Sequence, residues 1–288
     1  MWNLTKNLKS KCMNRLVFIV LSVLSIVGCT SEQVIENSHE MVTLRFSPYV
    51  MESMTRAVTS ISDYCTRLDV WFVEGANVQT IHQTAEDDDF GNVTITLDKT
   101  KTYNIIAVGH KCTDVATLNN DVISFPEGKL THAMVYSSSF TPASSSAVDC
   151  IMNRIVGMFR METTDALSSD CSKMTFAFTC NDKWNVASGM SSNEQSKTVT
   201  INITSTHDDG TVALSFYVMP DNLTDTKEVD IVATAYTLNN TVIQQKTFSS
   251  VPVKAGYKTT YRGAFFTDAS VTYTFTANDW NNFDTINF

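Results

Sequence analysis

Basic residues are in the minority in this chain, with 21 lysines and arginines against 30 aspartates and glutamates and a formal net charge of −9. Proteins that bind nucleic acids need clustered positive side chains to neutralise phosphates, so this composition excludes such a partner. A long apolar run is also missing. The clearest one, residues 16–27, is shorter than the ~20 residues that a membrane-spanning helix requires.

Motifs that carry chemistry are absent too. The sequence has no Cys-x-x-Cys pair, Gly-x-Ser-x-Gly elbow, phosphate loop or dinucleotide fingerprint. The acidic run at 86–89 could form either a calcium loop or a solvated turn, and consecutive carboxylates that point alternately favour the turn. The histidines lack metal-ligand spacing and are scattered at His39, His82, His110, His132 and His207. We therefore predict no enzymatic activity, no catalytic residue, no metal and no cofactor.

Cysteines are too few and too irregularly spaced to form a disulfide framework. An odd number follows residue 29, namely Cys65, Cys112, Cys150, Cys171 and Cys180. If residues 171–180 form one strand, its two ends lie ~30 Å apart and cannot be bridged. We therefore predict that all five side chains pack in a core.

The N-terminal segment has the pattern of a bacterial lipoprotein signal peptide. Basic residues precede the apolar run, which ends in Ile26-Val27-Gly28-Cys29, a sequence that resembles a lipobox. We predict a signal peptide at residues 1–28, with Met13 as an alternative start, and acylation of Cys29. Two alternatives stay open: an uncleaved anchor helix, and an ordinary signal peptide in which Cys29 is incidental.

The residues after Cys29 indicate where the lipid would hold the chain. Thr30 stands where aspartate would favour the inner membrane, so we expect the outer membrane as the lipid partner. Glu32 faintly resembles an acidic surface-export tag, which favours the exposed face. Residues 29–41 are polar and acidic and are typical of a tether. Removing the signal peptide, with its four basic residues, lowers the net charge to about −13.

Alternation of apolar and polar residues dominates the rest of the chain. Val42, Leu44 and Phe46 alternate with polar neighbours and start a series of short strands. The strands form two groups separated by the serine-rich residues 141–149. This pattern predicts an all-β protein with one sandwich at 42–150 and another at 151–288. Asp209-Gly210 is expected to form a tight hairpin turn between two strands of the second group.

Several segments together resemble the Bacteroidales fimbrillin superfamily, most closely its lipidated, FimB-type anchor branch. They are LDVWF at 68–72, FG at 90–91 followed by VTITL at 93–97, residues 103–110, and VPVKAGYKTTYRGAFF at 251–266. Each motif is short, but the resemblance extends over nearly the whole chain after the signal peptide.

This resemblance implies two transthyretin-like β-sandwiches and a role as an anchor or accessory subunit of a fimbria-like surface assembly. Neighbouring subunits would be the partners and would join by strand addition, for which Val42, Leu44 and Phe46 are the expected edge. Arg56 follows this first strand, where stalk subunits of the family are cut. A cut there would give a stalk or tip subunit without its lipid, whereas an uncut chain would be an anchor.

Glycan binding is the alternative function. Trp71, Trp184 and Trp280 could stack on sugars, and Trp184 and Trp280 neighbour Asn and Asp in contexts typical of loops. Aromatic residues on strands are more often part of a core, which is the competing interpretation. A surface glycan therefore stays a possible partner.

Overall fold

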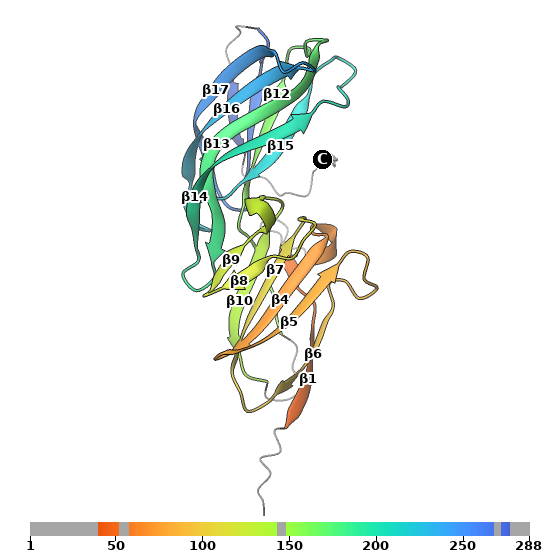
Figure 1. Cartoon of the computed structure of the whole chain (residues 1–288), viewed down its shortest axis with the longest axis vertical. Helices are drawn as coiled ribbons and strands as arrows, with labels where there is room; N and C mark the ends of the chain where they lie inside the picture. The colour runs from red at the N-terminus through yellow and green to blue at the C-terminus, as the bar shows by residue number, and fades with distance from the viewer. Residues whose placement is uncertain (1–39, 52–57, 143–147, 268–271, 277–288) are drawn as a thin grey trace, which may run out of the picture. The chain divides into compact units, whose positions relative to one another are not determined.

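The computed structural model describes residues 40–51, 58–142, 148–267 and 272–276. The chain divides by its contacts into residues 1–40 and 41–288, and every described residue except Glu40 belongs to the second unit. Figure 1 shows that this unit is built from strands. Its described part also contains two single-turn 3-10 helices, η1 (Ile61–Asp63) and η2 (Pro126–Gly128). No helix of the described part is long and apolar enough to cross a membrane.

The first half of the unit contains one five-stranded sheet and two small ones. The large sheet has the order β11-β10-β7-β4-β5 and is antiparallel throughout. Its strands are β11 (Asn153–Arg154), β10 (Met134–Phe140), β7 (Tyr103–His110), β4 (Arg67–Glu74) and β5 (Asn77–Thr84). The small sheets pair β1 (Met41–Phe46) with β6 (Val93–Asp98), and β2 (Tyr49–Met51) with β3 (Val58–Ser60).

The second half contains two larger sheets. One has the order β15-β12-β18-β19, from β15 (Ala213–Val218), β12 (Gly157–Thr163), β18 (Lys258–Gly263) and β19 (Thr272–Thr276). The other has the order β17-β16-β13-β9-β8, with β14 also paired to β13. Its strands are β17 (Val242–Val253), β16 (Lys227–Thr237), β13 (Cys171–Asn185), β9 (Val122–Ser124), β8 (Thr117–Asn119) and β14 (Met190–Asn202). The protein is thus an all-β sandwich protein, and the predicted fold class is confirmed.

Strand β4 separates two hydrophobic clusters because both of its faces are covered. Leu68, Val70 and Phe72 point into one cluster, which also contains Leu44 and residues of β6 and β7. Trp71, from the opposite face, lies in a second cluster that includes Trp184 and Met219. This second cluster therefore joins residues from both halves of the unit.

The long strand β13 buries every second side chain in the second half of the unit. Met174, Phe176, Phe178 and Cys180 are all at most 6% exposed and form part of the third cluster. Phe216 of β15 packs across from them, with its ring centroid 4.9 Å from that of Phe176.

The hairpin of β8 and β9 crosses the predicted boundary between the two sandwiches. It comes from the first half of the sequence, yet β9 pairs with β13 at Lys183–Asn185. The division into sandwiches at 42–150 and 151–288 stays a prediction.

The prediction of a hairpin at Asp209-Gly210 is wrong, although a turn is present there. Gly210 has a φ of +78°, and its N–H donates to the carbonyl of His207. However, β14 before the turn pairs with β13, whereas β15 after it pairs with β12. The turn therefore carries the chain from one sheet to the other, and sequence spacing alone does not distinguish this crossover from a hairpin.

The cysteines lie in cores, as predicted. Cys65, Cys112, Cys150, Cys171 and Cys180 are all buried and carry free thiols. Burial raises the pKa of the Cys65 thiol to about 12, so this side chain stays protonated and behaves as a small apolar group.

Candidate functional site at the first strand

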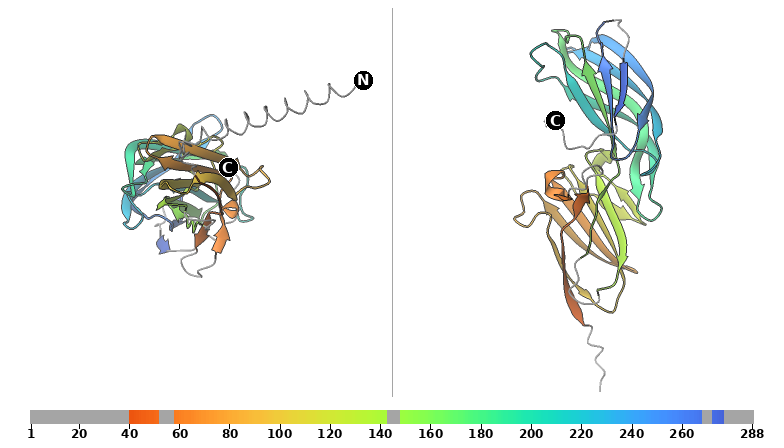
Figure 2. Two further views of the ribbon diagram at one scale, coloured as in Figure 1. Left: turned by 90° about the horizontal axis from the view of Figure 1, so that it is seen from below. Right: turned by 180° about the vertical axis from the view of Figure 1, so that it is seen from behind.

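Among the described strands, β1 lies at an open sheet edge. It pairs antiparallel with β6 along its whole length, from Met41 opposite Asp98 to Phe46 opposite Val93. Within the described residues, β6 is its only partner in that sheet, so the other edge of β1 presents unpaired backbone groups. Figure 1, and Figure 2 from behind, show β1 in orange-red beside β6.

The side chains of β1 alternate between the core and the surface, as predicted. Leu44 is 1% exposed and Phe46 is 6% exposed, and the Phe46 ring packs edge-on against Phe72 of β4 at 6.2 Å. Val42 is half-buried, whereas Thr43 and Arg45 are exposed. The first strand thus completes the core of the first half while it remains accessible along one edge.

Strand β2, which follows directly, is anchored to the segment after the predicted linker. The N–H of Tyr49 donates to the carbonyl of Cys150 at 3.0 Å, and the N–H of Met152 donates to the carbonyl of Tyr49 at 2.7 Å. The Tyr49 hydroxyl also donates to the Asp149 carboxylate, which raises the pKa of Tyr49. The next residue, Val50, is buried in the same core cluster as Leu44.

Two of the predicted functional residues lie outside the described residues. Cys29 belongs to residues 1–39 and Arg56 to residues 52–57. The lipidation of Cys29 and a cut after Arg56 therefore stay predictions. What the structure adds is the position of the strand between them, whose residues Val42, Leu44 and Phe46 were expected to form an assembly edge.

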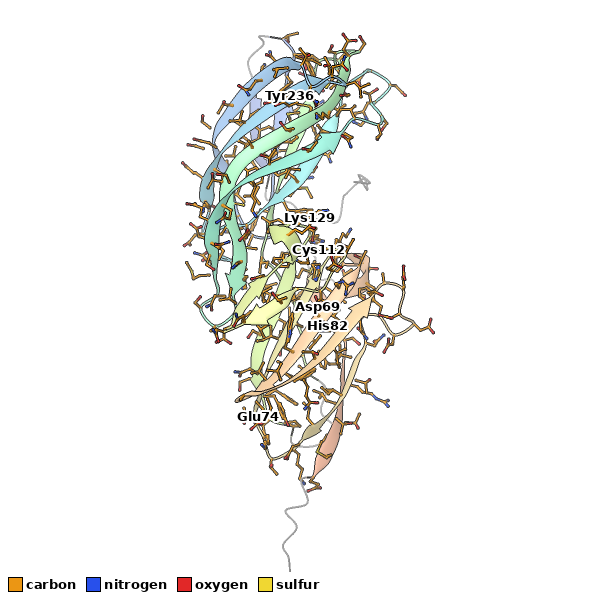
Figure 3. All side chains as sticks on the ribbon, in the orientation of Figure 1. Asp69, Glu74, His82, Cys112, Lys129 and Tyr236 are labelled. Atoms are coloured by element: carbon orange, nitrogen blue, oxygen red, sulfur yellow. The ribbon has the colours of Figure 1, made fainter. Side chains whose placement is uncertain are left out.

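A buried carboxylate that the sequence did not single out lies at the centre of the large sheet. Asp69 on β4 is fully buried and accepts hydrogen bonds at 2.8 Å from His82, His110 and the N–H of Ala116. Figure 3 labels Asp69 and His82 next to each other. The signal was present in the sequence, because an aspartate within the apolar run LDVWF must find partners if that run is buried.

The ring of His110 has both nitrogens occupied. Its Nδ1 accepts the N–H of Cys112 at 3.1 Å, so Nε2 carries the proton that is donated to Asp69. Burial is the largest single influence and lowers the pKa of His110, but the interactions with Asp69 and Cys112 together outweigh it, and the net pKa is raised. Since each partner is satisfied, we interpret this network as a cross-link between strands and not as a catalytic group.

A second unforeseen cluster forms around His132. Its Nδ1 lies 3.2 Å from the carbonyl oxygen of Tyr64, and Arg154 Nε donates to its Nε2 at 3.2 Å. The imidazole stacks on Tyr217 with 5.9 Å between ring centroids, and the Arg154 guanidinium lies over the Tyr64 ring. Burial first, and then the charge of Arg154, lower the pKa of His132 to about 3.

The tryptophans do not form an exposed platform among the described residues. Trp71 is 5% exposed and Trp184 only 1%. Trp184 lies on β13 and not in a loop, so that expectation was wrong, and Trp280 lies outside the described residues. Residues 86–89 form an exposed turn, in which Asp87 accepts the N–H of Thr84. In the described part of the chain, no three acidic, histidine or cysteine side chains gather to hold a metal ion.

These features define an all-β sandwich protein whose first strand completes a core at an open edge. The chain belongs to a family of unknown function (DUF6562), whose sequence model matches residues 113–286. No curated protein matches it.

Several solved structures from Bacteroidales are similar in fold. One is a candidate polysaccharide-binding protein of Bacteroides thetaiotaomicron, with 9% identity, 77% of this chain and 92% of that chain covered, and a TM-score of 0.51. The fimbrial anchor protein Mfa2 of Porphyromonas gingivalis shares 10% identity over 81% of this chain and 95% of its own, with a TM-score of 0.45. A fimbrial assembly protein of Parabacteroides distasonis shares 10% identity over 82% and 99%, with a TM-score of 0.41. At 9% identity, the first likeness shows the fold alone.

Proposed function

We propose that this chain is a lipid-anchored structural subunit, an anchor or accessory protein, of a fimbria-like surface assembly. Cys29 carries the lipid that holds it to the outer membrane, and neighbouring subunits join it by strand addition. The observation that carries the proposal is the position of β1, which fills a core groove beside β6 and whose outer edge is paired with no other strand in the described part of the chain.

Burial of the apolar side chains of β1 contributes enough stability that the groove which this strand occupies must always be filled. Burying a side chain the size of Leu44 or Phe46 contributes about 1.5–3 kcal/mol, so losing both would cost up to about 6 kcal/mol. A typical domain has a total stability of only ~5–15 kcal/mol. An empty groove is therefore unfavourable, and the strand that fills it comes either from the same chain or from a neighbouring subunit.

The origin of that strand distinguishes an anchor from a stalk subunit. A chain that keeps β1 also keeps Cys29 and its lipid, because both precede Arg56. A chain cut after Arg56 and separated from its first strand would lose the lipid and open the groove for a neighbour. We propose the anchor, and the packing of β1 into the core of its own chain supports this choice.

Mass spectrometry of the mature N-terminus, on protein isolated from membranes, tests the proposal. We expect a peptide that begins with acylated Cys29. A mature chain that begins at Ala57, isolated without the fragment that carries Cys29, would identify a stalk or tip subunit instead. An unmodified Cys29 in a protein released without detergent would overturn the lipid anchor.

Glycan binding gains no support from Trp71 and Trp184, the two candidate tryptophans among the described residues, because both are buried. Trp184 would have to leave the core before a sugar could stack on it.

A further inference from the structure

The contacts of Tyr49 differ from those of the rest of the N-terminal segment. β1 is held by a ladder to β6, whereas Tyr49 forms an isolated parallel bridge to Ile151. Two main-chain hydrogen bonds and the hydroxyl bond to Asp149 all converge on this one residue. Tyr49 thus ties the segment to residues 149–152, far along the chain, in addition to its antiparallel pairing with Ser60 of β3.

The residues around Tyr49 reinforce this connection. Val50 and Cys150 are 2% and 0% exposed and belong to one core cluster, together with Met152. On the other side of Tyr49, the Ser47 hydroxyl donates to the Asn92 side chain at 2.7 Å. None of these contacts depends on the covalent connection between β2 and β3.

We propose that Tyr49 and residues 149–152 form a retention clamp that keeps the first strand docked even when the chain is cut between β2 and β3. This inference rests on the proposed function and concerns its regulation. A cut after Arg56 leaves β1, β2 and the lipid in place, so the cut chain remains an anchor. Release of the first strand requires the clamp to open as a second, separate step.

The hydroxyl bond of Tyr49 can be removed while the rest of the fold stays in place, so the effect of the clamp can be measured by itself. A hydrogen bond to a carboxylate is stronger than one between neutral groups, so losing it should speed release of the strand about tenfold. Tyr49→Phe removes this bond and keeps the ring and the main-chain bonds. Asp149→Ala removes the same bond from the other side, and combining both variants should add little to either one.

The experiment uses the whole mature chain with a specific protease recognition sequence between Met51 and Val58. After cutting, size-exclusion chromatography with mass spectrometry follows the N-terminal fragment that contains β1 and β2. We expect it to stay bound in the unmodified background and to dissociate about tenfold faster in Tyr49→Phe and in Asp149→Ala. Thr43→Ala is the matched control, because it removes an exposed hydroxyl contact of β1 to Thr96 and should change the rate little.

Two results would overturn the clamp. The first is loss of the fragment from the unmodified background as soon as the chain is cut. The second is a Tyr49→Phe release rate equal to that of Thr43→Ala. No neighbouring subunit or membrane takes part in this assay, so its outcome is independent of whether Cys29 is acylated or a fimbria exists.

Discussion

His132 lies where an added proton would disrupt two existing contacts. Its Nε2 accepts a hydrogen bond from Arg154, and its Nδ1 faces the Tyr64 carbonyl, so the neutral ring with the proton on Nδ1 satisfies both. A second proton would place an N–H of His132 against the Arg154 donor. Lys111 adds a further positive charge that opposes protonation. Acidification should therefore destabilise the folded protein through this residue.

The size of this loss of stability follows from the difference between the pKa of His132 in the folded state and in the unfolded state. The pKa of His132 is about 3 when folded, against about 6.5 for an unfolded chain. Below pH 6.5 the unfolded state binds the extra proton, so stability present above that pH is lost as the pH falls toward 3. The slope is about 1.4 kcal/mol per pH unit, which gives a loss of about 2 kcal/mol by pH 5.

Urea unfolding of the mature chain between pH 7 and pH 5 measures this loss. His132→Gln removes the titrating group, so its stability should fall with pH by about 2 kcal/mol less than that of the unmodified chain over this range. His207→Gln, at an exposed position, is the control and should leave the pH dependence nearly unchanged. Equal pH slopes for His132→Gln and the unmodified chain would refute the reasoning.

Two further predictions concern the first strand and the buried carboxylate. Leu44→Asp should destabilise the fold by at least about 3 kcal/mol, because it replaces a core side chain with a charge. The control is Arg45→Gln on the exposed face, which should change the free energy of unfolding by less than about 0.5 kcal/mol in urea unfolding. Asp69→Asn should lower the free energy of unfolding by about 2–4 kcal/mol, because an amide cannot accept hydrogen bonds from all three groups that donate to Asp69. An unchanged midpoint in thermal unfolding would contradict this role.

The alternation of apolar and polar residues along the sequence was sufficient to predict strands and which of their faces is buried. Leu44 and Phe46 face the core because side chains in a strand point alternately to its two sides. The same rule, extended beyond Cys180, would have placed Trp184 in the core, since both lie on β13 at the same parity. Its polar neighbours suggested a loop instead. The error came from ending the strand too early.

Contacts between distant residues could not be predicted from the sequence. His132 and Arg154 meet because β10 and β11 pair, and Tyr217 reaches them from β15. Asp69 and His110 meet because β4 and β7 pair at the centre of a sheet. Strand pairing of this kind depends on the whole fold, and one sequence contains no direct signal for it.

The pairing of β9 with β13 has a practical consequence for work with fragments. A fragment that begins at residue 151 lacks β9, so Lys183–Asn185 of β13 lose their hydrogen-bonded neighbour. The sheet edge exposed there would favour aggregation. The family match begins at residue 113, just ahead of β8, and so includes this hairpin. Expression from residue 151 is therefore expected to give poorly behaved material. A start at residue 113 keeps β9 beside β13 but removes β7, so it leaves β10 without its neighbour in the other sheet.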